Sequence, residues 1–462
     1  MTFVVTTDYE IDKIAAPNLP LAPEQWDRRF QDQYSNVLRL YFNQLDNFIA
    51  QFMANASTLP VSGTVSLPPT YLDAFGRQRV SEPYTLFDSQ NRYAADNQFD
   101  VSTTGTGTTS FLSNEAAVKM EVTGAGVGSV KRQSYRSFPY QPGKGLLVLA
   151  TFVMDSSQSL NLTQRVGYYN DQNGVFFQRV DGTYSFVLRS YVTGSVSDAR
   201  TVNQSSWNGD KLDGTGASGY TLDPTKAQIL WMDFEWLGVG SVRCGFIING
   251  EYIVCHTFTN ANEITNVYMT TAILPVRYEI VTSSALAASM KSICCSVVSE
   301  GGFEQTSIDH VARRTTVLGT IGTTFLPLVS IRLASGRTGA VVIPNRVQVL
   351  PTTSQNYEVA LIKNPTLTGA TWASTVPSDS NVEFDVAATA TTGGTIVQTD
   401  YVTSTGSGGT SGTSFAAAYN FDLQLGASIA GTSDIYTVAI RTVSGATTGD
   451  AVGSLSFYDL TQ

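Results

Sequence analysis

The stretch from Trp207 to Phe258 constrains the fold most, because a long polar loop there runs into closely spaced apolar segments. Asn249-Gly250 lies between Val242–Ile248 and Glu251–Phe258, and Asn-Gly readily adopts the positive φ angles of a type I′ turn. The sequence therefore predicts a β-hairpin. The polar loop before it exceeds the usual length of a connection, and such loops are mostly functional or disordered. We expect a β-sandwich whose loops serve chemistry, recognition or assembly.

Composition narrows the class of protein. Charged residues make up only 14% of the 462 residues, whereas 39 residues are glycine, a mix that favours short strands and turns. A chain of this length is expected to form two or three domains. The net charge of −10 without any Lys/Arg cluster argues against nucleic acid as a partner. The apolar runs are too short to cross a membrane, so no membrane insertion is expected.

The N-terminal arm, residues 1–57, is predicted to hold one long amphipathic helix. Its large apolar residues recur at steps of three and four, with a second apolar stripe alongside. Such a helix is unstable alone in water. It can pack on its own sandwich, or it can bundle with other copies or dock on a larger assembly, which its terminal position favours. The predicted oligomerisation or docking surface consists of Trp26, Phe30, Tyr34, Val37, Tyr41, Leu45, Phe48 and Phe52.

The rest of the chain is predicted to be β. An extended linker at residues 58–84 leads to a jelly-roll sandwich at residues 85–309 and a smaller sandwich at residues 310–462. The fold class is therefore mainly β: a long N-terminal α-helix, a large jelly-roll β-sandwich and a second, smaller β-sandwich. Three segments have specific predictions: a loose turn at Thr103–Ser110, a mobile loop tip at Thr403–Ser414 and a half-buried strand at Tyr419–Leu425.

Asp233 and Glu235 are the strongest candidates for catalysis. Two carboxylates beside aromatic rings are what a glycosidase needs, because one must act as an acid and the other as a nucleophile or base. The laminarinase-like pattern Glu-x-Asp-x-x-Glu fails here, since Trp231 and Trp236 occupy both Glu positions. Other catalytic motifs are missing from the sequence, and it contains only two histidines. We expect no enzyme activity and no catalytic residue.

Neither a metal nor a cofactor is expected. The cysteines lack the spacing of a zinc site and are predicted to be buried thiols. Three aspartates of the polar loop match no calcium-binding spacing and are predicted to be solvated turn residues. The cysteines are Cys244, Cys255, Cys294 and Cys295, and the aspartates are Asp210, Asp213 and Asp223.

Exposed Tyr, Trp and Asn side chains on sandwich loops commonly stack on sugars and form hydrogen bonds with their hydroxyls. The same side chains can instead fold onto the sandwich, and the sequence leaves both alternatives open. The candidate glycan contacts are Trp207, Asn208, Tyr220, Tyr168 and Tyr169.

Several long motifs resemble a family of virion structural proteins of tailed phages, found in phages of marine and freshwater bacteria, including cyanophages. The segments that carry the resemblance are Asn18–Phe48, Asp73–Tyr93, the loop and hairpin from Trp207 to Phe258, Val267–Ile280, Ser292–Glu304, and PLVSIRLASGRTGAVVIPNRVQVL with NPTLTGATW near the C-terminus. The middle domain also resembles concanavalin-type and laminin-G-type jelly rolls, with no lectin motif to carry over.

This resemblance implies a non-enzymatic structural protein of the virion, synthesised in the host cytoplasm. The expected partners are copies of itself, as a homotrimer, and other virion proteins. A tail fibre or tail-associated appendage is the first expectation, and a capsid decoration protein that stabilises the head shell is the second. The alternative from another class is a module that binds, or less readily cleaves, glycans of the host surface.

Overall fold

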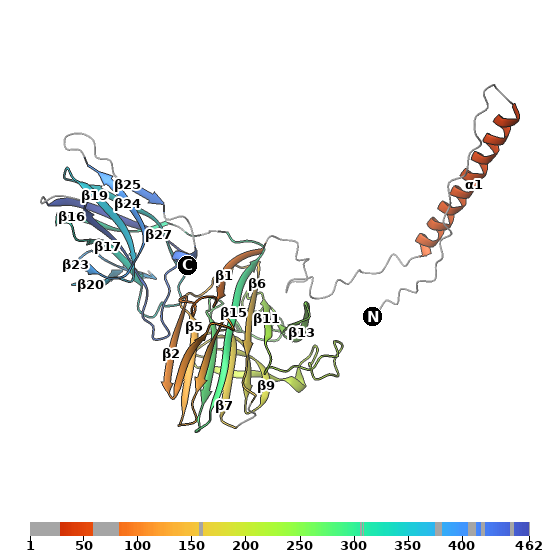
Figure 1. Cartoon of the computed structure of the whole chain (residues 1–462), viewed down its shortest axis with the longest axis horizontal. Coiled ribbons are helices and arrows are strands. Elements are labelled where there is room, and N and C mark those ends of the chain that lie inside the picture. The colour runs from red at the N-terminus through yellow and green to blue at the C-terminus, as the bar shows by residue number, and fades with distance from the viewer. Residues whose placement is uncertain are drawn as a thin grey trace. The chain divides into compact units, whose positions relative to one another are not determined.

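The computed structural model describes residues 28–58, 83–156, 160–304, 307, 309–374, 381–404, 413–416, 421–443 and 448–461, with only the backbone described for residues 48–58 and 413–416. The chain divides into two compact units, Met1–Leu67 and Pro68–Gln462. The fold is mainly β with one long helix among the described residues, which confirms the predicted fold class (Figure 1).

Helix α1 (Arg28–Thr58) belongs to the first unit. The rings of Phe30 and Tyr34 stack at 6.1 Å between centroids, as expected for neighbours one turn apart on one face. Two of the predicted surface residues, Phe48 and Phe52, lie in the helix without a described side chain, and Trp26 lies outside the described residues. None of the described helices is long and apolar enough to cross a membrane.

Two antiparallel sheets form the jelly roll (Figure 1). The first has the strand order β13-β12-β11-β6-β15-β4-β3, with β1 pairing with β15, and the second has the order β10-β9-β8-β7-β14-β5-β2. The strands are β1 (Pro83–Gln90), β2 (Phe99–Gly105), β3 (Gly107–Leu112), β4 (Ala117–Val122), β5 (Gly128–Ser134), β6 (Gly145–Val153), β7 (Leu162–Tyr169), β8 (Gly174–Val180), β9 (Thr183–Ser190), β10 (Ser197–Asn203), β11 (Gln228–Phe234), β12 (Val242–Ile248), β13 (Glu251–Phe258), β14 (Val276–Thr282) and β15 (Ala288–Glu300).

Aromatic side chains form the centre of the jelly-roll core. Phe177 packs against Phe152 of the first sheet at 5.9 Å, Phe186 at 5.5 Å and Phe246 at 5.1 Å between ring centroids. All four rings are completely buried. Phe177 and Phe246 meet edge to face, and the other pairs are tilted. Because each ring buries a large apolar area, this cluster stabilises the face-to-face packing of the two sheets.

The predicted hairpin is confirmed. Strands β12 and β13 have the predicted bounds, and Asn249 and Gly250 adopt φ angles of 53° and 83°. The predicted loose turn at Thr103–Ser110 is wrong, because all of its residues except Thr106 belong to β2 and β3, which pair in different sheets. Its β-branched threonines favour strands, and the turn is confined to Thr106, next to Gly105 with its φ of 55°.

The second sandwich is built from a four-stranded, a six-stranded and a two-stranded sheet around its own core. Its strands are β16 (Asp309–Ile321), β17 (Leu326–Leu333), β18 (Val342–Pro351), β19 (Asn356–Lys363), β20 (Thr366–Thr368), β21 (Ala373–Ser374), β22 (Val382–Asp385), β23 (Ala390–Thr392), β24 (Thr395–Thr403), β25 (Thr413–Ala416), β26 (Ile435–Thr442) and β27 (Gly449–Asp459). Most of the predicted loop tip at Thr403–Ser414 lies outside the described residues.

The strand predicted at Tyr419–Leu425 is wrong for the part that the structure describes. Residues Phe421–Leu423 form a short 3₁₀ helix, η3, and the alternation of apolar and polar residues has another cause. Phe421 is 4% exposed and packs against Phe303, 4.8 Å away, and Tyr84, 6.0 Å away, which both belong to the jelly roll. Phe421 therefore serves the junction between the two sandwiches, whereas Leu423 and Leu425 pack into the core of the second sandwich.

Backbone contacts join the sandwiches at this junction. The N–H of Ala427 donates to the carbonyl O of Tyr135 at 2.8 Å, and the side-chain amide of Gln424 donates to the carbonyl O of Ser137 at 2.7 Å. Gly426 lies so close that an added Cβ would be 2.8 Å from the Tyr135 carbonyl O. A side chain at this position must therefore push the two sandwiches apart.

We predict that Gly426→Ala lowers the free energy of unfolding by about 1–3 kcal/mol, the usual cost of forcing extra atoms into a packed site. Gly339→Ala is the matched control, because a Cβ at Gly339 meets nothing within 4 Å. Chemical denaturation of the two variants beside the wild type measures the difference. Equal stabilities of the two variants would contradict the close contact.

Candidate functional site

Trp207, the first residue predicted to contact glycans, is part of the core. Its side chain is only 2% exposed, and its ring centroid lies 4.8 Å from that of Phe186. The indole Nε1 donates to the carbonyl O of Val202 at 3.1 Å, so its one polar atom is also satisfied. The prediction of sugar stacking by Trp207 is wrong, because a ring that borders a sandwich core gains more from burial than from exposure.

The polar loop that follows Trp207 lies along the outer side of β13, at the edge of the first sheet. The N–H groups of Gly209 and Asp210 each donate at 2.9 Å, to the carbonyl O atoms of Cys255 and Val254. Asn208 extends this pairing, since its side chain donates to the carbonyl O of Thr257 at 2.9 Å and accepts from its N–H at 2.8 Å. Asn208 therefore completes the edge of the sheet.

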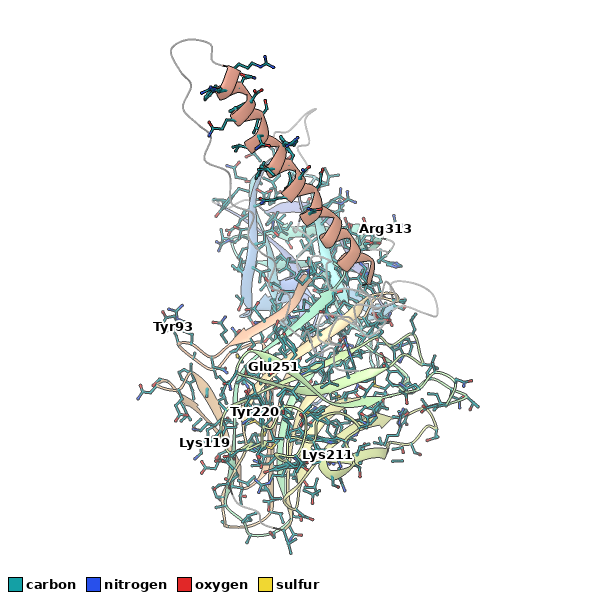
Figure 2. The ribbon with its side chains drawn as sticks, turned by 90° about the vertical axis from the view of Figure 1, so that its right-hand side faces the viewer. Tyr93, Lys119, Lys211, Tyr220, Glu251 and Arg313 are labelled. Atoms are coloured by element: carbon teal, nitrogen blue, oxygen red, sulfur yellow. The ribbon has the colours of Figure 1, made fainter. Side chains whose placement is uncertain are left out.

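Tyr220 closes the loop against the β12–β13 turn. Its hydroxyl accepts a hydrogen bond from Nδ2 of Asn249 at 3.1 Å, and its ring is partly exposed. Tyr220 and Glu251 lie on neighbouring segments in Figure 2, in agreement with this contact. Of the predicted glycan contacts, only Asn208 and Tyr220 reach the surface, and both have partners within the protein.

Tyr168 and Tyr169 lie at the end of β7 and are completely buried, so neither can contact a glycan as predicted. The Tyr168 hydroxyl lies 2.8 Å from the carbonyl O atoms of both Phe138 and Ala272. Tyr169 points to the opposite face of the sheet, where its ring centroid lies 4.5 Å from that of Phe176. The guanidinium of Arg277 covers this pair, 5.2 Å from the Tyr169 centroid. The two adjacent tyrosines point to opposite faces of one strand, as successive residues of a β-strand do.

The carboxylates considered for catalysis are also buried. Asp233 is completely inaccessible and forms an ion pair with Arg243, its direct partner in register on β12. Glu235 is 1% exposed and directly follows the end of β11, so neither carboxylate is accessible to a substrate. The guanidinium compensates the buried carboxylate, and removal of either partner would leave an unpaired charge in the sheet.

The four cysteines are free thiols, and burial raises the pKa of Cys244, Cys255 and Cys295. The loop aspartates cap turns: Asp213 and Asp223 each accept from an N–H two residues ahead, at 2.9 and 3.1 Å. Burial alone would raise the pKa of Asp210, but N–H groups of Ser218 and Leu212 lower it. No cluster of potential metal ligands occurs among the described residues.

A polar cleft of about 880 Å³ lies where the two sandwiches meet, and it is the strongest candidate for a binding site. Its walls come from both domains: Asp88, Asn97, Gln98, Tyr135 and Arg136 from the jelly roll, and Lys363, Asn364, Gly394, Thr395, Asp422 and Asp434 from the second sandwich. No sequence motif could reveal it, because the lining residues are spread over most of the chain and only the packing of the domains brings them together.

Two buried charges anchor the walls of this cleft. On the jelly-roll side, Arg136 donates to the carbonyl O of Phe421 at 2.6 Å and lies 3.5 Å from a carboxylate oxygen of Asp422. On the other side, Asp434 pairs with Lys363 at 3.1 Å and accepts from the Asn364 side chain at 2.6 Å. These charge-assisted contacts fix the orientation of the polar groups.

Comparison with known proteins gives likeness of fold only. No family model and no curated protein matches the chain. Among solved structures, the endo-β-1,4-glucuronan lyase from the fungus Trichoderma reesei is 14% identical, with a TM-score of 0.31, over 46% of this chain and 95% of that one. The Emp47p carbohydrate recognition domain is 9% identical with a TM-score of 0.30, over 47% of this chain and 97% of that one. The VIP36 exoplasmic/lumenal domain, bound to Ca²⁺ and Man3GlcNAc, is 12% identical with a TM-score of 0.28, over 47% of this chain and 90% of that one.

His256 makes stability depend on pH. Burial, with a further contribution from Arg200, lowers its pKa to about 4, and its Nδ1 accepts from the N–H of Asn208 at 3.3 Å. Between this value and the ordinary pKa near 6.5, the unfolded chain binds a proton that the folded chain does not, so stability falls as the pH drops through this window. The loss amounts to at most about 3 kcal/mol.

We predict that the free energy of unfolding, measured by chemical denaturation at each pH from 7 to 4, falls less steeply for His256→Asn than for the wild type. His310→Asn controls for the loss of a histidine elsewhere, and parallel curves for all three proteins would contradict the prediction.

Proposed function

We propose that this protein is a non-enzymatic structural component of a tailed-phage virion, a tail fibre or tail-associated appendage that assembles through its N-terminal helix. The observation that carries the proposal is the apolar stripe along α1. It is formed, among the described side chains, by Phe30, Tyr34, Val37, Tyr41 and Leu45. A helix with such a stripe needs a partner to be stable in water.

A second copy of the same helix is the partner that fits best. Polar residues such as Asn36 and Asn43 occupy the opposite face, so one face is suited to a bundle and the other to solvent. Closed cyclic symmetry is the rule for such self-association. We propose a homotrimer, the commonest arrangement of the phage fibres and decoration proteins that the sequence resembles. The resemblance to virion structural proteins over most of the sequence supports the same assignment.

The absence of a catalytic role is part of this proposal. The one carboxylate pair that suggested glycoside hydrolysis is buried, and its Asp233 is bound to Arg243. A general acid must instead reach the glycosidic oxygen of its substrate.

Helix-mediated assembly predicts that Tyr34→Glu/Tyr41→Glu dissociates the oligomer, because two carboxylates on the stripe must be desolvated in the bundle. Asn36→Glu/Asn43→Glu is the matched control, since it adds the same charges at the same spacing on the opposite face. Light scattering coupled to size exclusion should show a trimer for the wild type and the control and a monomer for the stripe variant. Deletion of residues 1–57 should have the same effect as the stripe variant. A monomeric wild type would overturn the proposal.

The virion assignment predicts that the protein is present in purified particles and lies on the tail. Gold-labelled antibodies against the second sandwich, viewed by electron microscopy on intact particles, locate it. Signal on the head shell would instead favour a capsid decoration protein. A protein that is abundant in infected cells but missing from purified particles would overturn the assignment.

A further inference from the structure

We propose that the polar cleft between the two sandwiches binds a short, neutral oligosaccharide. This inference concerns a different part of the chain from the assembly helix and does not depend on the proposed virion role. It rests on four properties of the cleft: its preformed walls, the polar groups still available in it, its charge balance and its single aromatic ring.

The walls are preformed because the junction holds them from both sides. The Ala427 N–H binds the Tyr135 carbonyl O at 2.8 Å, and the Ile429 N–H binds a carboxylate oxygen of Asp100 at 2.7 Å. Phe421, 4% exposed, packs its ring against Phe303 of the jelly roll at the same junction. Ligand binding therefore requires little ordering of the protein, which favours affinity for a small ligand.

Polar groups remain available on both walls. Asp88 and Asn97 from the jelly roll and Thr395 from the second sandwich line the cleft and are exposed. Their side chains make no hydrogen bond or ion pair within the described part of the chain. Together they offer a carboxylate, an amide and a hydroxyl, which accept from and donate to neighbouring sugar hydroxyls.

The charge of the cleft disfavours an anionic ligand. Three carboxylates, Asp88, Asp422 and Asp434, face two cations, Arg136 and Lys363, both of which already pair with carboxylates. The whole chain, with the cleft residues included, carries a net charge of −10. An acidic polysaccharide would be repelled by this field, whereas an uncharged sugar is not affected.

Tyr135 is the one aromatic residue among those that line the cleft. Its ring is half-buried, and its hydroxyl lies 3.5 Å from a carboxylate oxygen of Asp100. The C–H face of a pyranose can pack on such a ring while its hydroxyls reach the polar wall. The cleft volume of about 880 Å³ lies within the range of ligand pockets, roughly 300–1,000 Å³, and has room for several sugar units.

The test uses the full-length protein and tri- to hexasaccharides of glucose, mannose and galactose, with an oligogalacturonate of equal length as the charged probe. Saturation-transfer NMR and calorimetric titration measure binding. We expect at least one neutral series to bind, and Asn97→Arg/Thr395→Arg, which fills the cleft with two long side chains, to weaken it by at least about tenfold.

Asn114→Arg/Thr108→Arg is the matched control, because it makes the same changes at exposed positions of β3 and the β3–β4 turn. It should bind like the wild type, and thermal melting should show that both double variants are folded. Binding that survives in the cleft variant would overturn the proposal. So would a preference for the oligogalacturonate, or no binding of any neutral sugar at millimolar concentration.

Discussion

The hydrogen bond from the N–H of Ala427 to the carbonyl O of Tyr135 sets the separation of the two sandwiches. It is a backbone contact at 2.8 Å beside a glycine without room for a Cβ, so the domains meet at a separation set by main-chain atoms. Arg136, one residue after Tyr135, then reaches Phe421 and Asp422 of the second sandwich. These contacts join the two sandwiches at Tyr135 and Arg136, which both line the cleft.

The same junction explains which parts of the fold the sequence could predict. Strands β12 and β13 were predicted with their observed bounds, because Asn249-Gly250 is a local signal and apolar residues flank it. The helix was predicted from its periodicity. The segment around Phe421 was predicted as a strand because its alternation of apolar and polar residues is real, but Phe421 packs on the jelly roll while Leu425 packs in the core of the second sandwich. An alternating pattern indicates which residues are buried, but it does not indicate which part of the protein covers them.

The glycan contacts were mispredicted for a related reason. Tyr and Trp in a loop are taken as exposed because loops usually lie on the surface. Here Trp207 borders the core and Tyr169 lies beneath Arg277, so burial decides their role. The residues of the cleft have no such pattern, since Asp88, Asn97 and Thr395 come from distant parts of the chain. A site whose residues are brought together only by tertiary packing cannot be recognised from the spacing of those residues in the sequence.

The loop that pairs with β13 has a consequence for how copies of this protein can associate. An open edge strand invites another chain to extend the sheet, which leads to uncontrolled polymerisation. At this edge, Asn208, Gly209 and Asp210 already occupy the main-chain positions that an incoming strand would use. Growth by strand addition is therefore blocked at this edge, and a second copy can meet it only through side-chain contacts.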